Sequence, residues 1–184
     1  RRLLEVGVLC NNAELHGVDE EAEDVTAVGD PLEVALLVAG VKAGIRRQAL
    51  LSETPEVREV AFDAQSKMMA TFHEHDGAYH VAVKGALEAV LDASTHVLGT
   101  EGRETLDTEA REAWASRNEA LAAEGLRVIA MASKTVDDVE LDPYQNLTFL
   151  GLVALMDPPR EEVRGALASC QAAGVRVVMI TGDQ

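Results

Sequence analysis

Residues 67–85, KMMATFHEHDGAYHVAVKG, decide the expected fold, because they hold two strand-like runs on either side of Asp76-Gly77. An Asp-Gly pair between two such runs is typical of a β-hairpin with a two-residue type I′ turn. That turn fixes the register, which places Met69 opposite Lys84. The stretch therefore predicts an antiparallel sheet with Met69 and Lys84 as neighbours on one face.

Lys67 lies two residues before Met69, so an extended strand would place it on the same face as Lys84. The formal net charge is −16, and the lysines of the chain are Lys42, Lys67, Lys84 and Lys134. Two lysines this close favour an anion between them, and a ligand with phosphates and an apolar ring would suit the face. A solvated face on which both lysines pair with local acids fits the same positions. A bulge in either strand would also reverse the parity.

The residues around the hairpin indicate an α+β domain, an antiparallel sheet flanked by helices. One helix start is clear: Asp30 is at the N-cap, Pro31 at the first helical position and Glu33 at the capping-box position. Further helices are expected over 86–94 and 107–125, and further strands over 58–64 and 126–136.

The sequence pattern changes after residue 143. Continuous apolar strands are expected over 147–155 and 175–180, with a helix over 160–174 between them. This order is typical of a βαβ unit with buried parallel strands. The sequence therefore predicts one domain over 1–143 and a partial parallel α/β segment over 144–184.

Three side chains in the first part are candidates for contacts with a ligand. Phe62 offers a flat surface on which a base could stack, although a strand Phe often packs in a core. Glu33 could accept a hydrogen bond from an exocyclic amine, although a capping box explains it equally. Arg127 could contact a phosphate or ribose, or be an exposed strand residue.

Two aspartates lie at the carboxyl ends of the expected parallel strands. Asp157 follows the first strand and Asp183 the second, at the edge where α/β sheets place their chemistry. The helix after Pro159 would offer its N-terminus to an anion. Ordinary turn formation accounts for the same residues.

The composition excludes some partners. A net charge of −16 would repel nucleic acid and an anionic bilayer, and no apolar run reaches the roughly 18 residues of a membrane span. Cys10 and Cys170 lack metal-ligand spacing, so we expect free thiols in a reducing compartment. Because the chain starts at Arg1 and stops within RVVMITGDQ, we expect it to be a piece of a longer protein.

Taken in order, several motifs resemble those of P-type cation-transporting ATPases: CNNAEL, VGDPLEVAL, FDAQSKMM, VAVKGALEAVL, GLRVIAMA, LVALMDPPREEV and GVRVVMITGDQ. The DPPR form resembles the type II, calcium-pump-like members. The resemblance implies a nucleotide-binding domain followed by the start of a phosphorylation domain with a HAD- or Rossmann-like fold. Two residues depart from the family pattern: Ala64, where a polar or basic residue is frequent, and Leu87, where Pro is usual.

The resemblance implies ATP as the ligand, with Mg²⁺ bound mostly by residues outside this piece. It implies that Phe62 stacks on adenine and that Glu33 contacts the base edge. It also implies ATP contacts from Lys67, Met69, Lys84, Gly85, Arg127, Asp157, Arg160, Thr181, Gly182 and Asp183. No catalytic residue is expected here, because the DKTGT segment with the phosphorylated aspartate is absent from the sequence.

The implied parent is an integral membrane pump that couples ATP hydrolysis to cation transport. This piece would be a cytoplasmic part of it, with the remaining phosphorylation, actuator and transmembrane domains as partners. A non-catalytic regulatory or interaction domain, using its acidic surface to bind a basic partner, is the alternative. A stand-alone phosphatase of the same superfamily would need an Asp-x-Asp segment, which the chain lacks.

Overall fold

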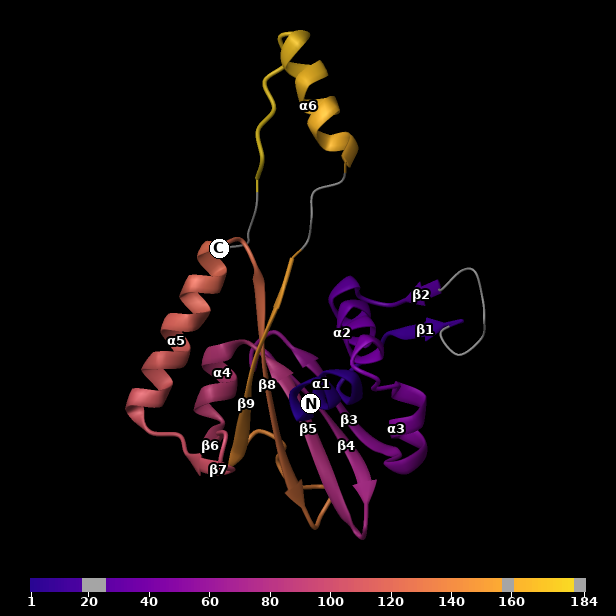
Figure 1. Ribbon diagram of the computed structural model, residues 1–184, viewed down its shortest axis with the longest axis vertical. Coiled ribbons are helices and arrows are strands. Elements are labelled where there is room, and N and C mark those ends of the chain that lie inside the picture. The colour runs from indigo at the N-terminus through magenta and orange to yellow at the C-terminus, as the bar shows by residue number, and fades with distance from the viewer. Residues whose placement is uncertain (18–25, 157–160, 181–184) are drawn as a thin grey trace.

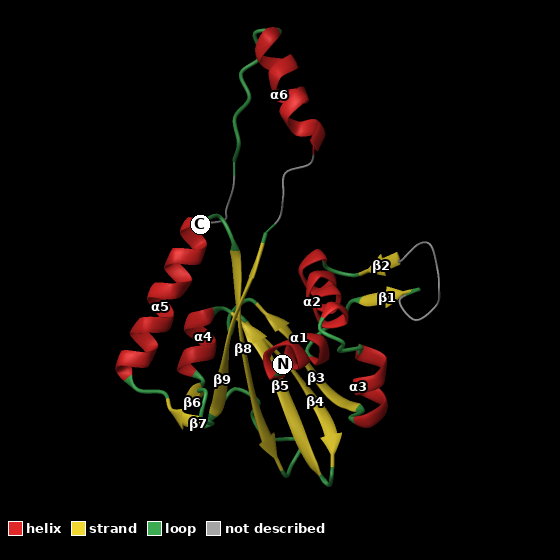
Figure 2. Ribbon diagram, viewed as in Figure 1, coloured by secondary structure: helices red, strands yellow, loops and turns green. Residues whose placement is uncertain are grey.

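The computed structural model describes residues 1–17, 26–156 and 161–180. Within these residues the main sheet has seven strands in the order β3-β4-β5-β8-β9-β6-β7 (Figures 1 and 2), and β1 and β2 form a separate antiparallel pair. The strands are β1 (Glu14–His16), β2 (Thr26–Val28), β3 (Glu56–Asp63), β4 (Met68–His75), β5 (Ala78–Gly85), β6 (Ser94–Leu98), β7 (Arg103–Thr105), β8 (Arg127–Val136) and β9 (Leu147–Leu155).

Helices cover both faces of the main sheet. On one face α1 (Arg2–Leu9) packs on β5 and β8, with α2 (Pro31–Lys42) and α3 (Arg47–Glu53) against α1. On the other face lie α4 (Leu87–Asp92) and α5 (Thr108–Ala123), which contact each other and β8. We call these the α1 face and the α5 face. The α+β domain with flanking helices is thus confirmed, although its sheet is mixed because β6 and β9 are parallel.

Each face has its own apolar core. On the α5 face Phe72 and Phe149 are fully buried, and the Trp114 ring meets Phe149 edge-on with centroids 4.9 Å apart. On the α1 face the sheet contributes Met69 and Met131. Alternation along each strand sends neighbouring residues to opposite cores, so the strand register decides which side chains share a face.

The central hairpin forms as predicted. Asp76 and Gly77 have φ of 51° and 79°, the left-handed pair that a type I′ turn requires. Met69 is the register partner of Lys84. The two-residue turn leaves no freedom in the pairing, which is why the sequence alone predicts it.

The predicted helix cap at Asp30 is also present, and the cap of the second long helix, for which both Asp107 and Thr108 are suitable, is Asp107. Asp30 precedes α2 and its Oδ1 accepts a hydrogen bond from the amide of Leu32 at 2.9 Å, with Pro31 at the first position. Asp107 caps α5 in the same way, accepting from the amide of Ala110 at 2.8 Å. These bonds satisfy amides that a helix start otherwise leaves unpaired.

The predicted parallel βαβ unit is not what the described residues form. β9 is antiparallel to β8 and parallel to β6, so it is a central strand of the main sheet. A boundary near residue 143 would separate β8 from β9, which are neighbours. The apolar run of β9 resembles a parallel-sheet strand because it is covered on both faces, Phe149 joining one core and Leu150 the other.

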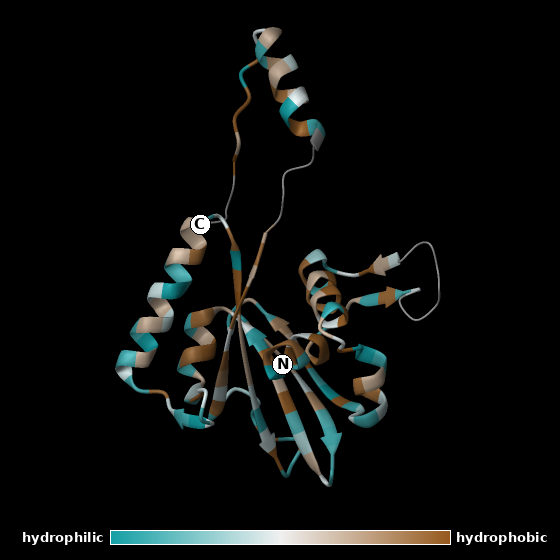
Figure 3. Cartoon of the chain, viewed as in Figure 1, coloured by the Kyte–Doolittle hydropathy of each residue, from teal (hydrophilic) through white to brown (hydrophobic). Residues whose placement is uncertain are grey.

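The last described segment contains one helix. α6 (Glu161–Ala172) confirms the helix expected there, but residues 175–180 have no strand assignment. Residues 175–180 are mainly apolar (Figure 3), yet the side chain of Met179 is 85% exposed and that of Ile180 is 94% exposed. Within the described residues, 175–180 is therefore exposed, unlike a strand in a core.

Candidate functional site

A row of side chains crosses the α1 face of the sheet. Met69 pairs with Lys84 between β4 and β5, and Lys84 pairs with Met131 between β5 and β8. Met69 and Met131 belong to the α1-face core, so Lys84 points to the same side. Lys84 is only 7% exposed, which is unusual for a lysine.

A bulge in β3 extends this row to Phe62. Val60 pairs with Ala70 and Asp63 with Met68, so three steps along β3 match two along β4. Met68 and Ala70 belong to the α5-face core, which places Val60 and Asp63 on that face. The residue before Asp63, Phe62, therefore lies on the α1 face opposite Met69. We call Phe62, Met69, Lys84 and Met131 the Lys84 row.

The ring of Phe62 is not part of either core. It is 62% exposed, whereas the other two phenylalanines are fully buried. The expected alternative of core packing is therefore wrong for this residue. An exposed aromatic face, separated from the buried Lys84 by Met69 alone, is a surface on which a planar ring can stack.

The buried charge of Lys84 is balanced by Glu33 from α2. The Lys84 ammonium donates to Glu33 Oε1, and the two side chains are 9% and 14% exposed. Glu33 Oε2 accepts from the amide of Asn12 at 3.2 Å. Both carboxylate oxygens therefore bind groups outside the first turn of α2, and the pair links the helix to the sheet.

Two asparagines that the sequence reasoning did not single out hold this pair in place. Asn11 is fully buried, and its side-chain amide donates to the carbonyls of Gly7 at 3.1 Å and Glu33 at 2.9 Å. Asn12 donates from its side chain to Glu59 Oε1 at 3.0 Å. The loop after α1 thus connects α2 to β3. The quoted motif CNNAEL contained the signal, since adjacent asparagines suit loops that bind backbone groups.

The thiol of Cys10 packs beneath the row. It is fully buried and its Sγ lies 3.5 Å from the carbonyl of Met69. Burial raises the pKa of Cys10 to about 12, although the nearby Lys84 charge acts in the opposite direction. The expectation of a free packing thiol is confirmed for Cys10, and Cys170 is also free.

Lys67 does not occupy the predicted position on the strand. It precedes β4 and has a left-handed backbone conformation with φ of 55°. The strand alternation that would place it on the same face as Met69 therefore does not include Lys67. Its amide donates to the carbonyl of Asp63 at 2.7 Å, closing the β3–β4 turn. Lys67 is exposed at the end of the sheet that also holds Lys84 and Phe62.

Gly85 is required by the close approach of this turn. A Cβ at residue 85 would lie 2.5 Å from the carbonyl oxygen of Lys67 and 2.8 Å from Met68 Cγ. The Lys67 carbonyl also accepts from the amide of Ala86 at 3.1 Å. Gly85 therefore positions the Lys67 turn against the end of β5.

Arg127 begins β8 and is exposed. It lies on the α1 face, since Ile129 and Met131 of the same parity belong to that core. Four residues separate it from Met131, which places it roughly 13 Å along the strand from the Lys84 row. The remaining predicted ATP contacts, Asp157, Arg160, Thr181, Gly182 and Asp183, lie outside the described residues.

Other features of the described residues lie away from this row. Two cavities, of about 870 and 320 Å³, are lined by residues other than Phe62, Lys67 and Lys84. The parts of the chain that the structure describes contain no helix long and apolar enough to span a bilayer. They also contain no group of three His, Cys, Asp or Glu side chains that could hold a metal ion.

Sequence comparisons relate this chain to known proteins. Residues 1–162 match the family described as "P-type ATPase, cytoplasmic domain N". The chain is 38% identical to Calcium-transporting ATPase 1 of Bacillus cereus, over all of this chain and 20% of the relative. It is 37% identical to Cation-transporting ATPase pma1 of Synechocystis sp., over 96% of this chain and 19% of the relative.

A third relative is the sodium/potassium exporting P-type ATPase cta3 of Schizosaccharomyces pombe, 38% identical over 98% of this chain and 18% of its own length. The chain thus spans about a fifth of the length of the curated relatives it matches. The family match covers the described residues up to 162, including the whole Lys84 row. The resemblance seen in the sequence motifs is therefore confirmed, and the chain belongs to the family of P-type ATPase cytoplasmic N domains.

Proposed function

We propose that the Lys84 row binds the adenosine part of ATP, with the base stacked on Phe62. The observation that carries this proposal is the β3 bulge, because it moves an exposed aromatic ring onto the face and row of Lys84. Without the bulge, Phe62 would share the face of Val60 and enter the opposite core.

The side chains around the ring suit the edge of a purine. Glu33 has one hydrogen bond to each oxygen, and each carboxylate oxygen can accept a second, so an exocyclic amine still has an acceptor. The charge of Lys84 is already balanced by Glu33. We therefore assign contact with the phosphates to the exposed Lys67 rather than to Lys84. Arg127 would contact the phosphate or ribose part of ATP. Met69 and Gly85 would contact the nucleotide without charged groups.

The expected affinity is low. Stacking of one base contributes about 1–3 kcal/mol, and exposed charged contacts add little because water screens them. A dissociation constant of mM to sub-mM, about −4 to −5 kcal/mol, follows. Weak binding suits a domain that delivers ATP to another domain.

For the whole protein we propose a membrane pump that hydrolyses ATP to move a cation across the membrane. The N domain would carry ATP to an aspartate elsewhere in the protein, where the γ-phosphate is transferred, so its contribution would be positioning. Asp157, Arg160, Thr181, Gly182 and Asp183 would contact ATP from the phosphorylation domain. The described residues do not fit a Mg²⁺ site, so we assign them no role in binding that ion.

The test is an NMR titration of the ¹⁵N-labelled chain with ATP. The substitutions are made at exposed residues, so that the variants still fold. Phe62→Ala should weaken binding about ten-fold, and Val57→Ala, at a position of β3 that is 45% exposed, should leave it unchanged. Lys67→Gln should weaken binding of ATP more than of adenosine, with Lys42→Gln as the control. Equal affinities for Phe62→Ala and Val57→Ala would contradict the proposal.

A further inference from the structure

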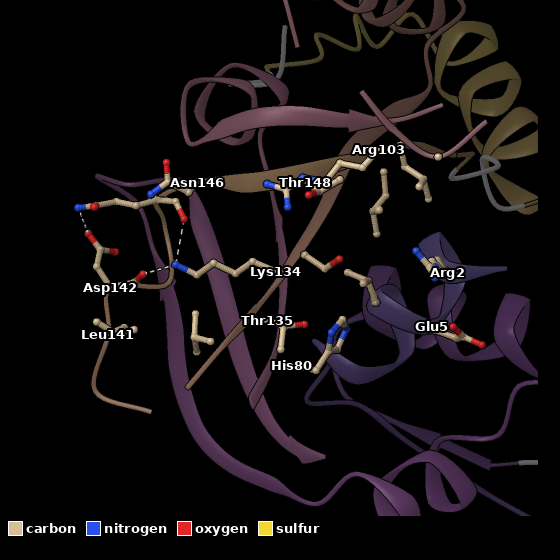
Figure 4. A pocket seen from close by; sticks show the side chains of 17 residues that line it. Arg2, Glu5, His80, Arg103, Lys134, Thr135, Leu141, Asp142, Asn146 and Thr148 are labelled. Carbon is tan, nitrogen blue, oxygen red and sulfur yellow. Dashed lines mark hydrogen bonds between the residues drawn. The ribbon is translucent and has the colours of Figure 1, made fainter. Parts of the chain in front are cut away.

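The larger cavity lies on the α1 face, far from the Lys84 row. Its volume is about 870 Å³, which is within the usual size range of small-molecule sites. It is walled by the start of α1, the strands β5, β8 and β9, the β6–β7 turn and the β8–β9 loop (Figure 4). On β5 it is lined by His80, four residues and therefore roughly 13 Å from Lys84.

The floor of this cavity is polar. Ser133 pairs with Thr148 across β8 and β9, and His80 pairs with Thr135 across β5 and β8, which puts all four side chains on the α1 face. Within the described residues, no hydrogen bond is found for the three hydroxyl groups. Under α1 the same face is apolar, and Met131 packs there. The hydroxyl groups lie beyond the part of the sheet that α1 covers.

The unneutralised charges at the cavity are positive. In the described parts of the chain, Arg2 has no hydrogen bond or salt bridge, and Arg103 has no carboxylate partner. The Arg103 guanidinium contacts Nδ1 of His96 at 2.8 Å, an interaction that leaves its charge unbalanced. Figure 4 shows Arg2 and Arg103 approaching the cavity from different sides.

The two carboxylates of the lining are already engaged. Glu5 is paired with Arg1 at 2.9 Å. Asp142 accepts from the amide of Tyr144 at 2.8 Å and from the side chain of Gln145 at 2.9 Å. Among the described residues at this cavity, the charges of Arg2 and Arg103 therefore remain without a partner of opposite sign, in a chain whose net charge is −16.

Lys134 fixes one wall of the cavity. Its ammonium donates to the carbonyls of Asp142 and Gln145 at 2.5 and 2.9 Å, which holds the β8–β9 loop beside β8. Burial lowers the pKa of Lys134, while the nearby Asp142 charge raises it. The wall is thus tied to the sheet rather than resting on side-chain packing alone.

We propose that this cavity binds a small organic anion with at least two acidic groups. One acidic group would meet the Arg2 guanidinium and a second would meet Arg103, and the body of the ligand would accept hydrogen bonds from Ser133, Thr135 and Thr148. Carboxylates and phosphate esters share this chemistry. The site is independent of the nucleotide-binding proposal, because no residue of the Lys84 row takes part.

The test is an NMR titration of the ¹⁵N-labelled chain with citrate and, separately, with fructose 1,6-bisphosphate, against sodium chloride at matched ionic strength. The expected result is saturable shifts at His80, Ser133, Thr135 and Thr148 with one or both anions and none with chloride. Which anion saturates tells whether the site takes carboxylates or phosphate esters.

Arg2→Gln and Arg103→Gln should each weaken this binding about ten-fold, the effect of one lost charge-assisted hydrogen bond. Both side chains are exposed, so the fold should persist, and the exposed Arg164→Gln is the matched control. Shifts that grow with ionic strength without saturating, or affinities unchanged in both cavity variants, would overturn the proposal.

Discussion

Removing one partner of the ion pair between Lys84 and Glu33 should destabilise the fold strongly, because the other charge would stay buried without a counter-charge. Lys84→Met removes the cation and leaves Glu33 only 14% exposed, with the Asn12 amide as its remaining hydrogen-bond partner. Removing one partner of a buried pair costs about 3–5 kcal/mol. Because Glu33 keeps one bond and some exposure, we expect a loss of about 2–3 kcal/mol in the free energy of unfolding.

Urea unfolding measures this loss. With a slope of about 2 kcal/mol per molar urea, the midpoint of Lys84→Met should fall by about 1–1.5 M. The double variant Lys84→Met with Glu33→Leu should recover at least half of the loss, because no buried charge is left unpaired. The reasoning fails if Lys84→Met lies within about 0.5 kcal/mol of the original chain, or if the two substitutions simply add.

Three further outcomes concern residues outside this pair. Burial lowers the pKa of His73 to about 4 from its ordinary 6.5, so stability that is complete above pH 6.5 is lost as the pH falls toward 4. His73 should account for a loss of about 2 kcal/mol in the free energy of unfolding between pH 7 and pH 5. Urea unfolding of His73→Gln at the two pH values should show a loss that is smaller by this amount. Gly85→Ala should cost about 1–3 kcal/mol by the same assay, because its Cβ would collide with the Lys67 carbonyl. Gly165→Ala, in helix α6 with open space around it, should instead be neutral or stabilising by up to about 1 kcal/mol. Tyr144→Phe should be neutral or stabilising by up to about 1 kcal/mol, since the Tyr144 hydroxyl is buried without a partner in the described residues. A loss of more than about 1 kcal/mol in the free energy of unfolding would contradict this and show that the hydroxyl has a partner.

The parts of the fold that the sequence predicts well are those set by local geometry. Asp76-Gly77 permits one turn, and that turn determines which residues face Lys84. Asp30 and Asp107 mark helix starts because their side chains satisfy amides within three residues. These interactions need no knowledge of the rest of the chain.

The parts that the sequence does not predict depend on distant partners. β9 was expected in a second domain, because its apolar run does not say which strands lie beside it. The short strands β1, β2, β6 and β7 and the helix α3 carry little periodic pattern and were not expected.

The candidate site shows the same division. Lys84 and Met69 were placed correctly, but the bulge that moves Phe62 onto their face leaves no mark in the sequence. Lys67 was misplaced because its left-handed backbone breaks the alternation. Glu33 occupies a capping-box position, and only the tertiary structure shows that its carboxylate binds Lys84 instead.

The most direct test of the central claim is a search for intermolecular nuclear Overhauser effects between ATP and the ¹³C-labelled chain. The account predicts contacts from adenine H2 and H8 to the ring protons of Phe62, because that ring is the exposed aromatic surface on the Lys84 row. Saturable ATP binding with adenine contacts to another aromatic ring, such as Trp114 on the opposite face, would contradict it.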